Sequence, residues 1–203
     1  MRARLWVCLI VLPFIAACSP KSEFAPDSAV AAVSYRDPGP AKLTLFTMVS
    51  NDTGSGAHTG LMINASQRVL FDPAGGFGHE TLPERNDVIY GITPQIAEVY
   101  KKSHARDTHH VIVQEIEVPA YDAELALRIA QSVGPVPSAQ CALSTSRLLS
   151  QLPSFQGQIR GTWFPVKLAD QMKKVPGVKT DRYFEFDDPD WERAVRAALD
   201  APA

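Results

Sequence analysis

The chain has 203 residues, with 20 lysines and arginines against 22 aspartates and glutamates, and a formal net charge of −2 at pH 7. It therefore lacks the excess of positive charge typical of proteins that bind nucleic acid, and we expect no such partner. It contains no internal repeat and no low-complexity block.

The N-terminus predicts export. Two arginines, Arg2 and Arg4, precede an apolar run over residues 5–15, which is typical of a secretory signal peptide and assigns it to residues 1–17. The run is shorter than the roughly 20 apolar residues that a membrane-spanning helix needs. Small residues follow it and lead to Cys18.

The sequence Ile-Ala-Ala-Cys that ends at Cys18 resembles a bacterial lipobox. This resemblance implies that Cys18 is acylated, as by palmitate, and becomes the first residue of a mature lipoprotein anchored in a membrane. Because Ser19 follows it and aspartate does not, the resemblance implies the periplasmic face of the outer membrane of a Gram-negative bacterium. Residues 18–40 are rich in proline and small residues and predict a flexible tether.

Residues 41–203, about 160 in number, are enough for one domain. Alternating and β-branched residues predict strands, and 3.6-residue periodicity with capping signals predicts helices, so that the fold class is α+β, an antiparallel sheet packed with helices. The strands are expected at 42–49, 58–63, 68–71, 110–118 and 183–186, and the helices at 93–102, 122–133, 138–152, 165–174 and 189–199.

Cys141 is the one free thiol expected in the mature protein, since Cys8 leaves with the signal peptide and Cys18 is lipidated. With Ser138 as N-cap, Cys141 falls at position N3 of a helix, where free N–H groups and the helix dipole favour an anion. A thiol there ionises below its free pKa of about 8.5, and the thiolate is a nucleophile.

His58 and Asp72 are predicted to complete a catalytic triad with Cys141. If the turn between their strands comprises residues 64–66, His58 lies directly opposite Asp72, within reach of a hydrogen bond. His58 is then the general base, and Asp72 orients its ring. The N–H of Cys141 and the side-chain amide of Gln140 are candidate oxyanion donors.

A His-x-Gly strand start at His58, a hairpin with a polar residue, and a later cysteine at a helix start resemble the circularly permuted NlpC/P60 group. The group includes enzymes like lecithin-retinol acyltransferase. The resemblance implies a papain-like fold over residues 43–153, with Cys141 as nucleophile, His58 as base and Asp72 as third member. Members often have Asn where this chain has Gln140.

Alternative readings of other residues stay open. His79 follows a glycine-rich loop and is a second candidate for the third member. His104, His109 and His110 cluster, but they lack the spacing of a zinc site, and no metal or cofactor is expected. Trp163 and Phe164 are expected in an aromatic core patch, with a substrate groove as the alternative.

The sequence thus predicts an envelope lipoprotein that acts as a thiol hydrolase or acyltransferase on an amide or ester. Stem peptides of peptidoglycan and acyl lipids are both candidate substrates. The alternative from another class is a non-enzymatic outer-membrane lipoprotein that uses the same fold to bind or scaffold a partner.

Overall fold

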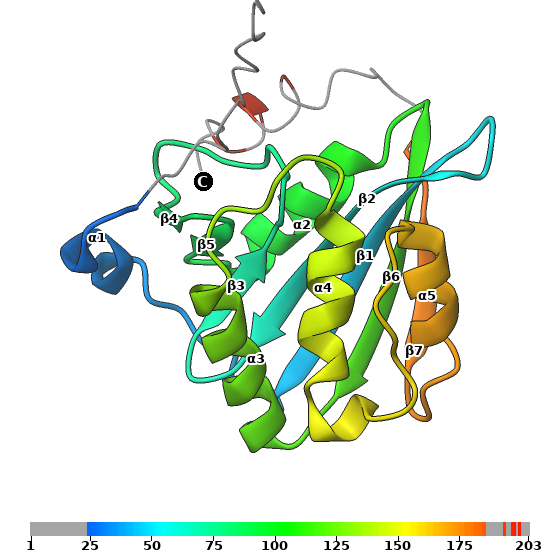
Figure 1. The fold of residues 1–203 in the computed structure, drawn as a ribbon. Coiled ribbons are helices and arrows are strands. Elements are labelled where there is room, and N and C mark those ends of the chain that lie inside the picture. The colour runs from blue at the N-terminus through cyan, green and yellow to red at the C-terminus, as the bar shows by residue number, and fades with distance from the viewer. Residues whose placement is uncertain (1–23, 186–192, 194–195, 198, 200–203) are drawn as a thin grey trace, which may run out of the picture.

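The structure, a computed structural model, describes residues 24–185, 193, 196–197 and 199. A seven-stranded antiparallel sheet carries helices on its faces (Figure 1), so the domain is α+β as the sequence predicts. The strands are β1 (Lys42–Ser50), β2 (Gly56–Asn64), β3 (Arg68–Phe71), β4 (Glu84–Arg85), β5 (Val88–Tyr90), β6 (His109–Glu117) and β7 (Lys179–Tyr183). The helices are α1 (Asp27–Ala32), α2 (Pro94–His104), α3 (Ala120–Ser132), α4 (Cys141–Ser150), α5 (Pro165–Met172) and a short 3-10 helix, η1 (Pro153–Phe155).

The strand order is β4-β5-β3-β2-β1-β6-β7, which places β1 and β2 near the middle of the sheet. β1 is buried along seven consecutive residues because both of its faces are covered. Leu43 and Leu45 point into a core shared with α3, α4 and α5, whereas Phe46 and Met48 point into a second core shared with α2. The sheet is therefore the middle layer, with one core on each of its faces.

The β2–β3 hairpin has a different register from the one expected. Ile63 pairs with Val69 and Leu61 with Phe71, whereas a turn over residues 64–66 requires Ile63 opposite Gln67. The observed turn has the same length but lies one residue further along the chain, over residues 65–67, because Asn64 itself pairs with Arg68; each residue of β2 therefore pairs with a residue of β3 two positions later than expected. A shift of two residues keeps every side chain on its original face. His58 and Asp72 thus stay on the same side of the sheet, as diagonal neighbours.

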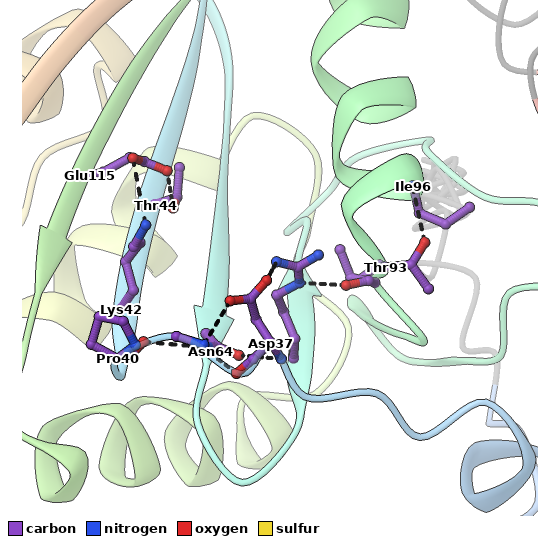
Figure 2. A network of polar contacts seen from close by, with 11 residues as sticks. Asp37, Pro40, Lys42, Thr44, Asn64, Thr93, Ile96 and Glu115 are labelled. Atoms are coloured by element: carbon purple, nitrogen blue, oxygen red, sulfur yellow. Dashed lines mark hydrogen bonds and ion pairs between the residues drawn. The ribbon is translucent and has the colours of Figure 1, made fainter.

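The segment before β1 is held against the domain. Arg68 Nη1 donates to Asp37 Oδ2 in an ion pair at 2.9 Å, and the backbone N–H of Asp37 donates to Asn64 Oδ1 at 3.1 Å. Asn64 Nδ2 in turn donates to the carbonyl of Pro40 at 3.1 Å (Figure 2). Further upstream, Ala25 N–H donates to the carbonyl of Glu84 at 2.9 Å. Residues 24–40, expected as part of a flexible tether, are therefore hydrogen-bonded to the domain, because polar partners are available on β2, β3 and β4.

Several elements agree closely with their sequence signals, and α2 shows why. Thr93 caps it by accepting from the N–H of Ile96 at 3.3 Å (Figure 2). Pro94 occupies position N1, and both features are as predicted. The last strand is the exception, since β7 begins at Lys179, four residues before the start of the expected strand at 183–186. The helix expected at 189–199 lies largely outside the described residues, as do Cys18 and the signal peptide.

Among the residues that the structure describes, none of the helices has the length and apolar character needed to cross a membrane.

Candidate active site

His58 and Asp72 are joined by a short hydrogen bond at one end of the sheet. His58 is the third residue of β2, Asp72 directly follows β3, and His58 Nε2 lies 2.7 Å from Asp72 Oδ1. Because a carboxylate oxygen accepts, Nε2 carries the proton, and Nδ1 is left for another partner. The pairing predicted from the sequence therefore exists, although it is made diagonally across the ladder.

Asp72 is a buried carboxylate with three donors. The residue as a whole is 3 % exposed. Oδ1 also accepts from the Tyr100 hydroxyl at 2.6 Å, and Oδ2 accepts from the N–H of Phe77 at 3.4 Å. Burial raises the pKa of Asp72, but the charge and hydrogen bond of His58, with the Tyr100 hydroxyl, outweigh it and leave the pKa below the usual value. Asp72 is therefore ionised at neutral pH.

Two glycines make room for this carboxylate. A Cβ added at Gly75 would lie 1.8 Å from Asp72 Oδ2, and one added at Gly60 would lie 2.2 Å from the Tyr100 hydroxyl oxygen. No real side chain tolerates such distances, so both positions require glycine for the observed geometry. The glycine-rich loop after Asp72 thus encloses the carboxylate.

The electrostatics of His58 favour its protonated form. Burial lowers its pKa, but the charge of Asp72 and the hydrogen bond to it raise the pKa to about 10, with a smaller contribution from Cys141. An imidazole with this pKa is an imidazolium at neutral pH. It can stabilise a thiolate beside it as an ion pair.

Cys141 is the first residue of α4, and it contacts His58. Burial raises the pKa of the thiol, but the hydrogen bond and charge of His58 and backbone N–H groups of Thr59 and Ala142 lower it below the usual value. The N–H of Thr59 is available because the β2–β3 ladder ends two residues further on, at Leu61. The site therefore lies where the first residues of β2 meet the start of α4.

The start of α4 differs from its predicted place. Cys141 is at N1 rather than N3, and the capping residue is Gln140, not Ser138. The reason is a turn closed by the N–H of Gln140 and the carbonyl of Pro137, in which Ala139 has a positive φ of 64°. The helix begins only after this turn, but Cys141 keeps its place in the first turn, where N–H groups lack helical acceptors.

Asp87 fixes the segment that leads to Cys141. Its Oδ2 accepts from the N–H of Val136 at 2.6 Å, and its carbonyl accepts from the N–H of Asp72 at 2.8 Å. Burial raises the pKa of Asp87. One residue in the turn between β4 and β5 thus holds both the loop before the thiol and the residue that pairs with His58.

The structure bears on the oxyanion role predicted for Gln140 and Cys141 through the exposure of Cys141 and the hydrogen bonds of Gln140. Cys141 is 6 % exposed, so little of the residue is open to solvent. The side chain of Gln140, at the N-cap position, makes no capping hydrogen bond to α4. Its role as an oxyanion donor stays a prediction.

The other histidines have different environments. His79 Nδ1 contacts Thr81 Oγ1 at 2.9 Å within its own loop, so Asp72, and not His79, is the partner of His58. His109 contacts Thr108, and His110 contacts Asn51, both at the strand end. Within the described ranges, no group of three or more His, Cys, Asp or Glu side chains is arranged to hold a metal ion.

Two residues of α2, Tyr100 and His104, were missed as members of the site. His104 Nδ1 donates to the carbonyl of Tyr100 at 2.7 Å, and its ring stacks on that of His58 at 6.2 Å between centroids. Burial lowers the pKa of His104 to about 4, so this ring is neutral at pH 7. Their i, i+4 spacing on a helix was the available signal, but it does not say which strand the helix covers.

Trp163 and Phe164 are not in the core. They are 54 % and 58 % exposed, whereas the adjacent Pro165 is buried. A Cβ added at Gly56 would lie 2.7 Å from Pro165, which shows that the start of α5 abuts the start of β2. The core patch expected for these aromatics is therefore wrong, and the exposed pair lies at the same end of the sheet as His58.

Comparison of the chain with protein-family models, with curated proteins and with solved structures found no match.

Proposed function

We propose that the protein is a thiol hydrolase or acyltransferase of the cell envelope, with a permuted NlpC/P60-like, papain-like arrangement of its site. The observation that carries this proposal is the continuous contact from Cys141 to His58 to Asp72 at the meeting point of α4, β2 and β3. The order along the chain, with the histidine strand before the cysteine helix, is that of the permuted group.

The chemistry follows from the atoms in contact. In the resting pair Nδ1 of His58 already holds the proton of the Cys141 thiol, and the thiolate attacks the carbonyl carbon of an amide or ester while the carbonyl oxygen becomes an anion. When the oxyanion collapses, the bond to the amine or alcohol breaks, and this leaving group takes the proton from Nδ1. A thioester to Cys141 remains.

In the second half of the reaction, His58 accepts a proton from water or from another acceptor, which attacks the thioester carbonyl. Collapse expels the thiolate and releases an acid or a new acyl product. Asp72 keeps the Nε2 proton in place through both halves, so that the proton to be exchanged is always at Nδ1. The N–H groups of the first turn of α4, with the Gln140 amide, are the proposed donors to the oxyanion.

The proposed location is the periplasmic face of the outer membrane, where the protein is anchored by a lipid at Cys18. This location is supported by the lipobox-like sequence alone. It would bring the site close to both peptidoglycan stem peptides and acyl lipids. The exposed pair of Trp163 and Phe164, at the same end of the sheet as His58, favours contact with an apolar substrate group.

An acyl-enzyme experiment tests the proposal. The protein is mixed with a p-nitrophenyl ester, p-nitrophenol release is followed in the first turnover, and the Cys141 peptide is analysed by mass spectrometry. We expect a burst of p-nitrophenol and an acyl group on Cys141, both absent in Cys141→Ala. His58→Ala should slow acylation at least a hundredfold.

The non-enzymatic alternative predicts the opposite result. If the low exposure of Cys141 reflects a purely structural thiol, no burst occurs and the Cys141 peptide stays unmodified under conditions where the fold is intact. That outcome would leave a binding or scaffolding lipoprotein as the better account. Cys141→Ser is a matched control, since it keeps the size of the side chain and removes the strong nucleophile.

A further inference from the structure

We propose that Tyr100 is a positioning residue that holds the Asp72 carboxylate in the orientation in which Oδ1 receives Nε2 of His58. This inference rests on the proposed function, because it concerns how the base of that reaction is oriented. Tyr100 does not touch the reacting atoms and acts only through Asp72.

The hydrogen-bond geometry supports this role. The Tyr100 hydroxyl and His58 Nε2 approach the same oxygen, Asp72 Oδ1, at 2.6 Å and 2.7 Å. Among the residues that the structure describes, the hydrogen-bond partner of the other oxygen, Oδ2, is the N–H of Phe77, at a long distance of 3.4 Å. The terminal torsion of an aspartate is intrinsically soft, so a carboxylate keeps one orientation only where its donors fix it. Tyr100 is the stronger of the two donors other than His58.

Tyr100 is itself held rigidly. It is 1 % exposed, and its ring packs edge-on against Phe46 at 5.1 Å and Phe77 at 4.9 Å between centroids. Its carbonyl accepts from His104, the last residue of α2. A rigid ring places the hydroxyl with little loss of freedom when it donates, which suits a positioning role.

The protonation state of Tyr100 also suits a permanent donor. Burial, and then the negative charge of Asp72, raise the pKa of Tyr100 well above its usual value. The hydroxyl therefore keeps its proton over the whole range in which His58 and Cys141 exchange theirs. Gly60 leaves the space through which this hydroxyl reaches the carboxylate.

Tyr100→Phe tests the inference, because it removes only the hydroxyl and keeps the packed ring. The rate of alkylation of Cys141 by iodoacetamide is measured against pH in the full chain, read from the Cys141 peptide so that other cysteines do not contribute. We expect the apparent pKa of the thiol to rise by about one unit, with alkylation at neutral pH several-fold slower. Tyr90→Phe is the matched control: Tyr90 is equally buried but its hydroxyl contacts Gln131, away from the site.

The outcomes separate the inference from the proposed function. If the wild-type thiol has a low apparent pKa and Tyr100→Phe leaves it unchanged, or lowers it, while the protein stays folded, the positioning role is wrong and the proposed function stands. A wild-type thiol with an ordinary pKa would instead undermine the proposed function. In an Asp72→Ala background, removal of the Tyr100 hydroxyl should cause no further shift in the thiol pKa, since the two residues act as one unit.

Discussion

Gly75 sets the position of the Asp72 carboxylate, and this gives a prediction at the scale of one residue. In Gly75→Ala the new methyl group would overlap Asp72 Oδ2, so the carboxylate must move away from its place beside His58. Loss of a charged hydrogen bond should lower the pKa of His58 by one unit or more. Nuclear magnetic resonance titration of the His58 ring measures this shift.

Gly78→Ala is the control in the same loop. The nearest atom to its new methyl group would be Glu84 Oε2 at 3.9 Å, an ordinary contact. The pKa of His58 should therefore be unchanged. If Gly75→Ala and Gly78→Ala titrate alike, the packing of the loop does not determine the geometry of Asp72.

Gln140 gives a second prediction for a single side chain. If its amide stabilises the oxyanion, Gln140→Ala should slow acylation of Cys141 by an ester about tenfold or more. The same variant should leave the pH dependence of Cys141 alkylation unchanged, because alkylation by iodoacetamide forms no oxyanion. Equal acylation rates in Gln140→Ala and wild type would assign the oxyanion to backbone N–H groups alone.

Helix α2 carries both Tyr100 and His104, so its stability matters to the site at the scale of the element. Thr93→Ala removes the side-chain acceptor for the N–H of Ile96. We expect the free energy of unfolding to fall by about 1 kcal/mol, the usual cost of a lost N-cap. Urea denaturation measures this loss, and Thr93→Ser, which keeps the hydroxyl, should recover most of it.

The elements also show what sequence patterns could and could not predict. Alternation and β-branched residues located β3 at its observed bounds and β1 and β6 within one residue at each end. The two-residue β4 and three-residue β5 are too short to show a period, and no strand was expected there. These two strands nevertheless position the site, since Asp87, which accepts hydrogen bonds from Val136 and Asp72, lies in the turn between them.

Features that depend on backbone geometry or on contacts between distant residues were also hard to predict from the sequence. The start of α4 was misplaced because the positive φ of Ala139 has no signature in an alanine, which ordinarily favours helix. The hairpin register was misplaced by two residues, and this error did no harm to the site because it preserved the face. The pairing of Cys141, His58 and Asp72 could thus be inferred from residue types and order, but Tyr100 required the placement of α2 over the sheet.

At the scale of the whole molecule, the site has a predictable effect on stability. If Cys141 and His58 form a thiolate–imidazolium pair in the folded protein, the two side chains together hold one proton. In the unfolded chain, between the ordinary pKa values of 6.5 for His58 and 9.0 for Cys141, a neutral imidazole and a thiol also hold one proton. Equal proton numbers mean that this pair contributes no pH dependence to the free energy of unfolding between pH 7 and 8.5.

Cys141→Ala removes that balance. His58 still has a raised pKa because Asp72 remains, so the stability that it contributes is full below pH 6.5 and is lost as the pH rises toward about 10. The free energy of unfolding should therefore fall by roughly 2 kcal/mol between pH 7 and 8.5 in Cys141→Ala, and stay nearly level in the wild type. Urea titrations at several pH values measure both. A wild-type curve that falls as steeply would show that the folded thiol is neutral.

The dependence of stability on pH below 6.5 has a separate origin, which is His104. His104 is neutral in the folded protein with a pKa of about 4, but it gains a proton below pH 6.5 when unfolded. Stability should therefore decline as the pH falls from 6.5 toward 4. Substitution His104→Gln should make the decline shallower, as measured by thermal unfolding across this range.

The central claim is that Cys141 and His58 form a thiolate–imidazolium pair. Its most direct test is the rate of iodoacetamide alkylation of Cys141 as a function of pH, in the wild type and in His58→Ala. The account predicts an apparent thiol pKa well below the ordinary value in the wild type and a rise toward that value in His58→Ala. A slow thiol with an ordinary pKa, indifferent to the loss of His58, would contradict it.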